Sequence, residues 1–226
     1  MNVFLNVLKA YYSSDKDVIF AGNTSENYVA LTFDDGPHPV DDHALLDVLD
    51  KHGVKATFFL LGKHMEAHPE HTKEISKRGH EIGNHSFSHN WTVTFPVSQT
   101  SIKQEILRTN DIIEEITGVR PSYFRPPRLV QGKKIARVLK ELEMKSIIAS
   151  AFTLDFIWQE DPQAIFEGVK AMISPGCIIV LHSGHADHGA RKQKRRDGTI
   201  VAVDLLLSYL RENGYGVGTV TALLDR

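Results

Sequence analysis

Residues 28–37 read Tyr-Val-Ala-Leu-Thr-Phe-Asp-Asp-Gly-Pro, and this stretch decides the predicted fold class. The run from Tyr28 to Phe33 is apolar and prone to form a β-strand. Gly36 and Pro37 then favour a turn. Asp34 and Asp35 therefore follow the C-terminal end of a predicted strand. Alone, the segment could equally be an ordinary turn, because Asp-Gly-Pro is common in turns.

Strand and helix signals alternate along the rest of the chain. Further strands are predicted at 54–61, 80–83, 122–124, 145–149, 177–181 and 215–220. Helices are predicted at 43–51, 64–78, 102–117, 133–143, 162–173 and 201–213. About seven strand-then-helix units without an internal linker indicate one parallel α/β domain over residues 1–226, either a barrel or an open sheet.

The composition excludes few classes of function. The chain has 226 residues, of which 42% are hydrophobic and 24% charged, as in ordinary globular proteins. A formal net charge of -2 favours neither nucleic acid nor a membrane surface, so no nucleic-acid partner is expected. The single cysteine, Cys177, excludes an intrachain disulfide and reads as a buried thiol.

Targeting signals are weak. No apolar run approaches the roughly 20 residues of a membrane-spanning helix, so no integral membrane segment is expected. The N-terminus does not read as a signal peptide. As given, the chain is expected to be soluble and cytoplasmic, or to have been cut from a longer precursor. The sequence carries no signal for an oligomeric state.

Reactive side chains follow several of the predicted strands. Active sites of α/β barrels are built at the C-terminal ends of their strands, and scattered surface residues would rarely distribute in this way. The residues concerned are Asp34, Asp35, His85, His89, Arg125, Asp155 and His182.

The pair His85 and His89 has the spacing of two imidazoles on one helical turn, where both can reach one ion. The chain has 12 histidines, so such a pair can also arise by chance. With Asp35 it would complete a site of two histidines and one carboxylate, which suits a catalytic zinc. Two prolines follow Arg125 and fix the backbone of its loop, so its guanidinium is suited to binding a carboxylate.

Other polar residues read as solvated. His185 and His188 follow His182 in a glycine-rich loop, where such side chains usually face solvent. The basic run at 191–196 reads as a solvated loop, with contact to an anionic polymer as a weaker alternative.

Five motifs together resemble the polysaccharide deacetylases with a NodB homology domain, carbohydrate esterase family 4. They are Thr-Phe-Asp-Asp-Gly-Pro (32–37), Asn-His-Ser-Phe-Ser-His (84–89), Arg-Pro-Pro-Arg (125–128), Thr-Leu-Asp-Phe (153–156) and Leu-His-Ser (181–183). They occur in the family order over about 150 residues. The resemblance implies a distorted (β/α) barrel of about seven parallel strands.

The resemblance also implies roles for the strand-end residues. Asp35, His85 and His89 would be the metal ligands. Asp34 would be the general base, with Arg125 holding its carboxylate.

The remaining implied roles concern the acid and the substrate. His182 would be the general acid, oriented by Asp155. The backbone N–H of Arg128 would donate to the oxyanion, and Leu181 would line the pocket for the acetyl methyl.

The chain departs from the family pattern in two motifs. Arg128 stands where the family usually has Tyr or Phe. Its backbone N–H should still donate to the oxyanion, while its side chain could alter substrate binding. The fourth motif usually reads Asp-x-x-Asp-Trp, and here Phe152 and Phe156 replace its first Asp and its Trp. Trp158 could fill some of the missing space.

The function implied is a metal-dependent hydrolase that removes N-acetyl groups from an N-acetylglucosamine-containing glycan, such as chitin, a chitooligosaccharide or peptidoglycan, and releases acetate. The acetylated glycan would be its partner. One divalent metal ion is implied, zinc first, with cobalt, nickel or manganese as alternatives. Two other readings remain: a deacylase of O-acetylated xylan or an N-formyl sugar, and a catalytically silent carbohydrate-binding member. Members of the family are often secreted or associated with the cell wall.

Overall fold

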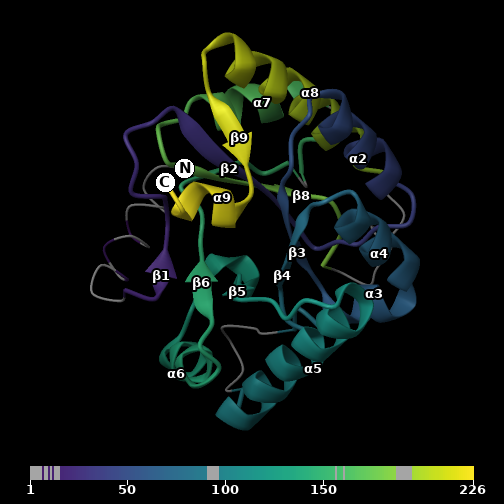
Figure 1. Cartoon of the computed structure of the whole chain (residues 1–226), viewed down its shortest axis with the longest axis vertical. Helices are drawn as coiled ribbons and strands as arrows, with labels where there is room; N and C mark the ends of the chain where they lie inside the picture. Colours follow the sequence, from purple (N-terminus) through teal and green to yellow (C-terminus); the bar gives the residue numbers. More distant parts are fainter. Residues whose placement is uncertain are drawn as a thin grey trace.

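A parallel sheet curled into a half-barrel forms the centre of the protein, with helices around its outside (Figure 1). The computed structural model describes residues 7, 10, 12, 16–90, 97–155, 157–159, 161–186 and 195–226. Within these residues the nine strands follow the order β1-β6-β5-β4-β3-β2-β8-β7, and β9 also pairs with β2. They are β1 (Val18–Ile19), β2 (Tyr28–Asp34), β3 (Thr57–Leu60), β4 (Glu81–Asn84), β5 (Tyr123–Phe124), β6 (Lys145–Ile147), β7 (Ala151–Phe152), β8 (Ile178–His182) and β9 (Gly216–Gly218).

The strand β2 is the centre of the sheet and is buried on both faces. It pairs along one edge with β8, while β9 and β3 share its other edge. Side chains alternate along a strand, so Leu31 and Phe33 pack in the cluster on the helix side. Ala30 packs in a separate cluster with Phe59 and Ile178. Asp34 shares the face of Ala30, which directs its side chain to the inside of the half-barrel.

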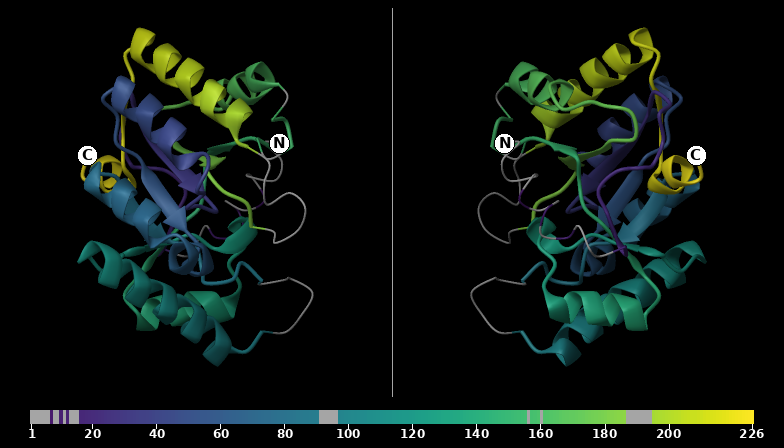
Figure 2. Two further views of the ribbon diagram at one scale, coloured as in Figure 1. Left: turned by 90° about the vertical axis from the view of Figure 1, so that its right-hand side faces the viewer. Right: turned by 90° about the vertical axis from the view of Figure 1, so that its left-hand side faces the viewer.

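Most helices cover the outer face of the sheet, whereas the last helix, with Val220 and Leu223, packs in the inner cluster that contains Ala30. In Figure 2, α7 and α8 lie at the top and α5 and α6 at the bottom, with the strands between them. The helix α8 packs against both α7 and α2. The helices are α2 (Asp42–Lys51), α3 (Gly62–Ala67), α4 (Pro69–Lys77), α5 (Gln99–Thr117), α6 (Lys133–Glu141), α7 (Pro162–Lys170), α8 (Asp197–Glu212) and α9 (Val220–Leu224), with a 3-10 turn at Pro127–Leu129.

The predicted fold class is confirmed, and several element boundaries differ from the prediction. The helix predicted at 64–78 is two helices, α3 and α4, that meet at His68, because Pro69 disfavours a helical conformation in the residue before it. The short strands β1 and β7 and the helix α9 were not predicted. No helix in the described ranges has the length and apolar character needed to cross a membrane. A single domain over residues 1–226 stays a prediction.

Candidate active site

The strand ends surround one cavity of about 360 Å³. Six of the predicted site residues line it: Asp34, Asp35, His85, His89, Arg128 and His182. Arg125 and Asp155 are fully buried behind them. The structure therefore brings together eight residues that are up to about 150 positions apart in the sequence.

Leu181 does not join this group. It packs in the cluster between the sheet and the helices, and Val180 lines the cavity in its place. The reason is the alternation of side chains along β8: Val180 and His182 are two residues apart and share a face, whereas Leu181 lies on the other. A contact of Leu181 with substrate is therefore not supported, and Val180 occupies the corresponding position.

Arg125 holds Asp34 at the end of β2. Nη1 of Arg125 donates to Asp34 Oδ1 and to Thr32 Oγ1, each at 2.7 Å. Nε and Nη2 donate to the carbonyls of Ile147 and Ile148, each at 3.1 Å. Burial lowers the pKa of Arg125, and the charge of Asp34 opposes that effect. This hydrogen bonding compensates the buried guanidinium and holds one oxygen of Asp34.

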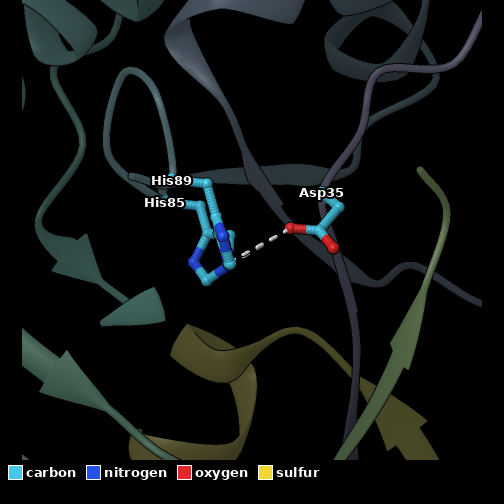
Figure 3. A group of neighbouring side chains, drawn as sticks. All are labelled: Asp35, His85 and His89. Carbon is cyan, nitrogen blue, oxygen red and sulfur yellow. Dashed lines mark ion pairs between the residues drawn. The ribbon is translucent and has the colours of Figure 1, made fainter. Parts of the chain in front are cut away.

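Asp35, His85 and His89 form the cluster that can hold a metal ion, because one ligand atom from each lies within 4.8 Å of the others. Asp35 Oδ1 is 3.5 Å from His85 Nε2 and 3.7 Å from His89 Nε2 (Figure 3). That oxygen is buried and has no hydrogen-bond partner within the described residues. A buried carboxylate oxygen of this kind needs compensation, and a cation between the three groups would provide it.

The proton positions suit a metal as well. His85 Nδ1 lies 2.8 Å from the carbonyl of Arg125, which can only accept, so Nδ1 carries the proton and Nε2 is free to bind a cation. Burial opposes the charged form of Asp35, but His85, His89 and His182 hold the pKa of Asp35 well below its usual range. Burial lowers the pKa of His89 to about 4, so its imidazole is neutral at pH 7.

The two histidines do not lie on a helical turn, and that part of the prediction is wrong. They lie in the loop after β4, where Ser86 and His89 have φ of 70° and 59°. Asn84 Oδ1 accepts from the Ser86 N–H at 2.7 Å, and Ser86 Oγ accepts from the His89 N–H at 3.1 Å. This turn, rather than helical periodicity, brings the ring centroids within 5.1 Å.

His182, at the end of β8, and Asp155 form a hydrogen-bonded pair. His182 Nδ1 lies 2.7 Å from Asp155 Oδ1, and the His182 backbone N–H donates to Asp155 Oδ2 at 2.9 Å. Burial lowers the pKa of His182, but Asp155, Asp35 and Asp34 together raise it to about 9. The imidazole is therefore charged at pH 7 in the metal-free chain and has a proton to give.

Arg196 is a site residue that the sequence did not reveal. The solvated loop predicted at 191–196 lies partly outside the described residues, but Arg196 itself is only 2% exposed and lines the cavity. Its Nε donates to the Gly184 carbonyl at 3.1 Å, and its backbone N–H donates to Asp41 Oδ2 at 2.9 Å. The carboxylates near Arg196 are far from it in the sequence, so the residues around position 196 give no sign that this arginine is buried.

The departures from the family motifs fall around the cavity. Arg128 has a left-handed φ of 61°, is exposed and lines the cavity. Phe152 also lines it. Phe156 lies outside the described residues. Trp158 lies beside Gly168 of α7 rather than on the cavity wall, so it does not fill the space that was predicted for it.

Comparison with known proteins defines the class. The sequence profile of the polysaccharide deacetylase family matches residues 21–147, and the chain belongs to this family. A peptidoglycan-N-acetylglucosamine deacetylase of Bacillus cereus is 32% identical over 208 residues, which cover 91% of this chain and 71% of that protein.

Solved structures agree with this assignment. The Bc1960 peptidoglycan N-acetylglucosamine deacetylase superimposes with a TM-score of 0.85 and 29% identity, covering 95% of each chain. BA3943 of Bacillus anthracis, described as a CE4 family pseudoenzyme, gives a TM-score of 0.77 and 28% identity, covering 92% of this chain and 69% of that one. The predicted family, barrel class and deacetylase class are therefore confirmed. The family is metal-dependent, and the Asp-His-His cluster provides a possible site.

Proposed function

We propose that this protein removes the N-acetyl group from an N-acetylated amino sugar of peptidoglycan or a related glycan, with zinc as its metal. The observation that carries the proposal is that the two adjacent acids have different partners. Asp34 is held by Arg125, at 2.7 Å, whereas Asp35 faces two imidazoles. His182, with a proton to give, lies on the same cavity.

The roles of the residues follow from their partners. Asp35, His85 and His89 would hold a divalent cation, which would supply a Lewis acid and lower the pKa of a water. Asp34 takes the proton of the attacking water through Oδ2, the oxygen that faces His85 at 4.0 Å and is not bonded to Arg125.

The remaining residues act on the carbonyl and the leaving group. The backbone N–H of Arg128 donates to the developing oxyanion, and Val180 contacts the acetyl methyl. His182 gives its Nε2 proton to the leaving amine, and acetate and a free amino sugar result. Asp155 accepts the hydrogen bond from His182 Nδ1–H, so His182 Nε2 is the atom that faces the substrate.

Peptidoglycan is the favoured substrate class because the two peptidoglycan deacetylases named above act on it. The exposed Arg128 adds a cation at the cavity, which suits a glycan that carries carboxylates. O-acetylated xylan and N-formyl sugars use the same catalytic groups, so a substrate panel separates them.

A catalytically silent carbohydrate-binding protein is the competing function, and BA3943 makes it a serious one. The described residues argue against it here, because the base, its arginine, the three candidate ligands and the acid pair are all present at one cavity. Glycan binding without acetate release would support the silent alternative.

The test measures acetate released from peptidoglycan, chitooligosaccharides and acetylated xylan, before and after chelation and after return of each divalent metal. We expect acetate release from peptidoglycan. Chelation should abolish this release, and zinc should restore it best. Asp34→Asn should abolish release while the protein still binds one metal ion, because the base is removed and the ligands remain. Near-complete activity of this variant would exclude Asp34 as the base.

A further inference from the structure

We propose that Thr199, in the first turn of α8, is a positioning residue for His182: its hydroxyl orients Asp155, and Gln159 sets the direction of that hydroxyl. The inference rests on the proposed function, in which His182 is the acid. It extends the pair of His182 and Asp155 to a hydrogen-bonded chain of four side chains.

Both oxygens of Asp155 are occupied. Oδ1 accepts from His182 Nδ1 at 2.7 Å. Oδ2 accepts from the His182 backbone N–H at 2.9 Å and lies 3.0 Å from Thr199 Oγ1. Asp155 is fully buried and Thr199 is 1% exposed, so water does not compete for these contacts.

The orientation of the Gln159 amide follows from its neighbours. The Thr199 N–H can only donate, and it lies 3.2 Å from the amide atom assigned as Oε1. The other amide atom lies against the carbonyl oxygen of Asp155, which can only accept, so that atom is the Nε2 donor.

This orientation decides the direction of the Thr199 hydroxyl. Nε2 of Gln159 lies 2.7 Å from Thr199 Oγ1 and donates to it. The hydroxyl therefore has one proton left to give, and Asp155 Oδ2 is the acceptor at hand. Gln159 thus donates to Thr199, and Thr199 donates to Asp155.

The first turn of α8 is packed tightly enough to keep this geometry. A Cβ on Gly198 would lie 2.2 Å from the backbone carbonyl oxygen of Gln159. Two residues before it, Arg196 donates to Asp41 and to the Gly184 carbonyl. The turn therefore joins the segment of Asp155 to the loop that follows His182.

Among the described residues, charged groups of both signs face the pair. His182 faces Asp155, Asp35 and Asp34. Asp155 faces His182 and Arg196. Without the hydroxyl, Asp155 would lose one of the two donors at Oδ2 and would hold the imidazole of His182 less firmly. This change would weaken proton delivery in the transition state more than substrate binding. We therefore expect kcat to fall and KM to stay nearly the same.

The experiment compares Thr199→Val, which keeps the shape and removes the hydroxyl, with Thr199→Ser, which keeps the hydroxyl. Thr72→Val is the matched control, because Thr72 is a fully buried threonine of α4 whose hydroxyl has no partner within the described residues. We expect Thr199→Val to lower kcat at least about tenfold with KM within about twofold, an effect as large as that of residues that orient metal-binding histidines. Thr199→Ser and Thr72→Val should keep the wild-type kcat.

A spectroscopic readout separates this inference from the proposed function. The downfield proton resonance of His182 Nδ1–H, assigned by its loss in His182→Gln, should move in Thr199→Val and stay in Thr199→Ser. If the wild type released no acetate, the proposed function would fail, and this resonance would still decide whether Thr199 acts on the pair.

Three results would overturn the inference. They are wild-type kcat in Thr199→Val, an equal loss of kcat in Thr199→Ser, and an unmoved resonance in Thr199→Val. If Thr199→Val does not fold, Gln159→Leu replaces it, because the hydroxyl then loses the donor that directs it. An unmoved resonance in that variant would overturn the inference equally.

Discussion

Asp34 and Asp35 reach one cavity although neighbouring side chains of a strand point to opposite faces. Asp34 keeps the register of β2 and faces inward. Asp35 has a left-handed φ of 70°, which turns its carboxylate back to the same side. His64 Nδ1 lies 2.8 Å from the Asp35 carbonyl and helps to hold this conformation. A single residue of unusual backbone conformation thus lets two adjacent acids take different partners.

The titration of His182 is a prediction at the same scale. Burial lowers the pKa of His182, but the neighbouring carboxylates raise it to about 9 in the metal-free chain. Because this value lies above the roughly 6.5 of a free histidine, the charged pair stabilises the fold below pH 6.5 and the stabilisation is lost as pH rises through about 9.

Histidine NMR of the metal-free chain should therefore give a pKa near 9 for His182. Asp155→Asn should bring this pKa to about 6.5 or below, because burial disfavours the charged imidazole and the carboxylate that stabilises it is then gone. Added zinc should also lower it, since a neighbouring cation disfavours the imidazolium. A pKa of His182 that is the same in Asp155→Asn and in the wild type would contradict the assignment.

At the scale of elements, the long periodic segments were predictable, whereas two of the shortest strands were not. The strand β2 and the helices α2, α5 and α8 carry enough residues to show their period. The strand β5, which has two residues, was predicted at 122–124. The equally short strands β1 and β7 show no period and were not predicted. They exist because neighbouring strands offer hydrogen-bonding partners, which is a property of the assembled sheet. The loops after the strands then carry the chemistry.

The loop after β8 gives a prediction at this scale. Gly184 donates its N–H to the Asp34 carbonyl at 3.3 Å, and a Cβ there would lie 2.1 Å from the Asp35 carbonyl oxygen. Gly184→Ala must therefore displace the backbone of Asp35, and we expect metal affinity to fall at least about tenfold, as when other supporting contacts of a ligand are lost.

Competition with a fluorescent chelator measures the affinity of Gly184→Ala. The control is Gly132→Ala, because Gly132 has a φ of -84° and a Cβ at this position would meet no other atom within 4 Å, so affinity should not change. Equal affinity of Gly184→Ala and the wild type would show that the loop does not support Asp35.

For the whole molecule, one apolar cluster joins the sheet to α2, α7 and α8 and so holds the strand ends in place. Adjacent leucines of α8 test it: Leu206 is 1% exposed and belongs to the cluster, whereas Leu205 is 38% exposed. Leu206→Ala should lower the free energy of unfolding by about 2–5 kcal/mol. Leu205→Ala should change it by about 0.5 kcal/mol or less. Urea unfolding measures both, and equal losses would contradict the packing described for α8.

The sequence by itself determined the class of the fold, the family and most of the reactive groups, because strand-end motifs are local in the chain. Tertiary structure alone decided which groups meet. The register of β8 placed Val180 rather than Leu181 at the cavity, and a loop rather than a helical turn joined His85 to His89. Thr199 and Arg196 entered the site from the start of α8, and Thr199 lies 44 residues from Asp155. Such contacts depend on how distant segments pack, and no local pattern of residues encodes them.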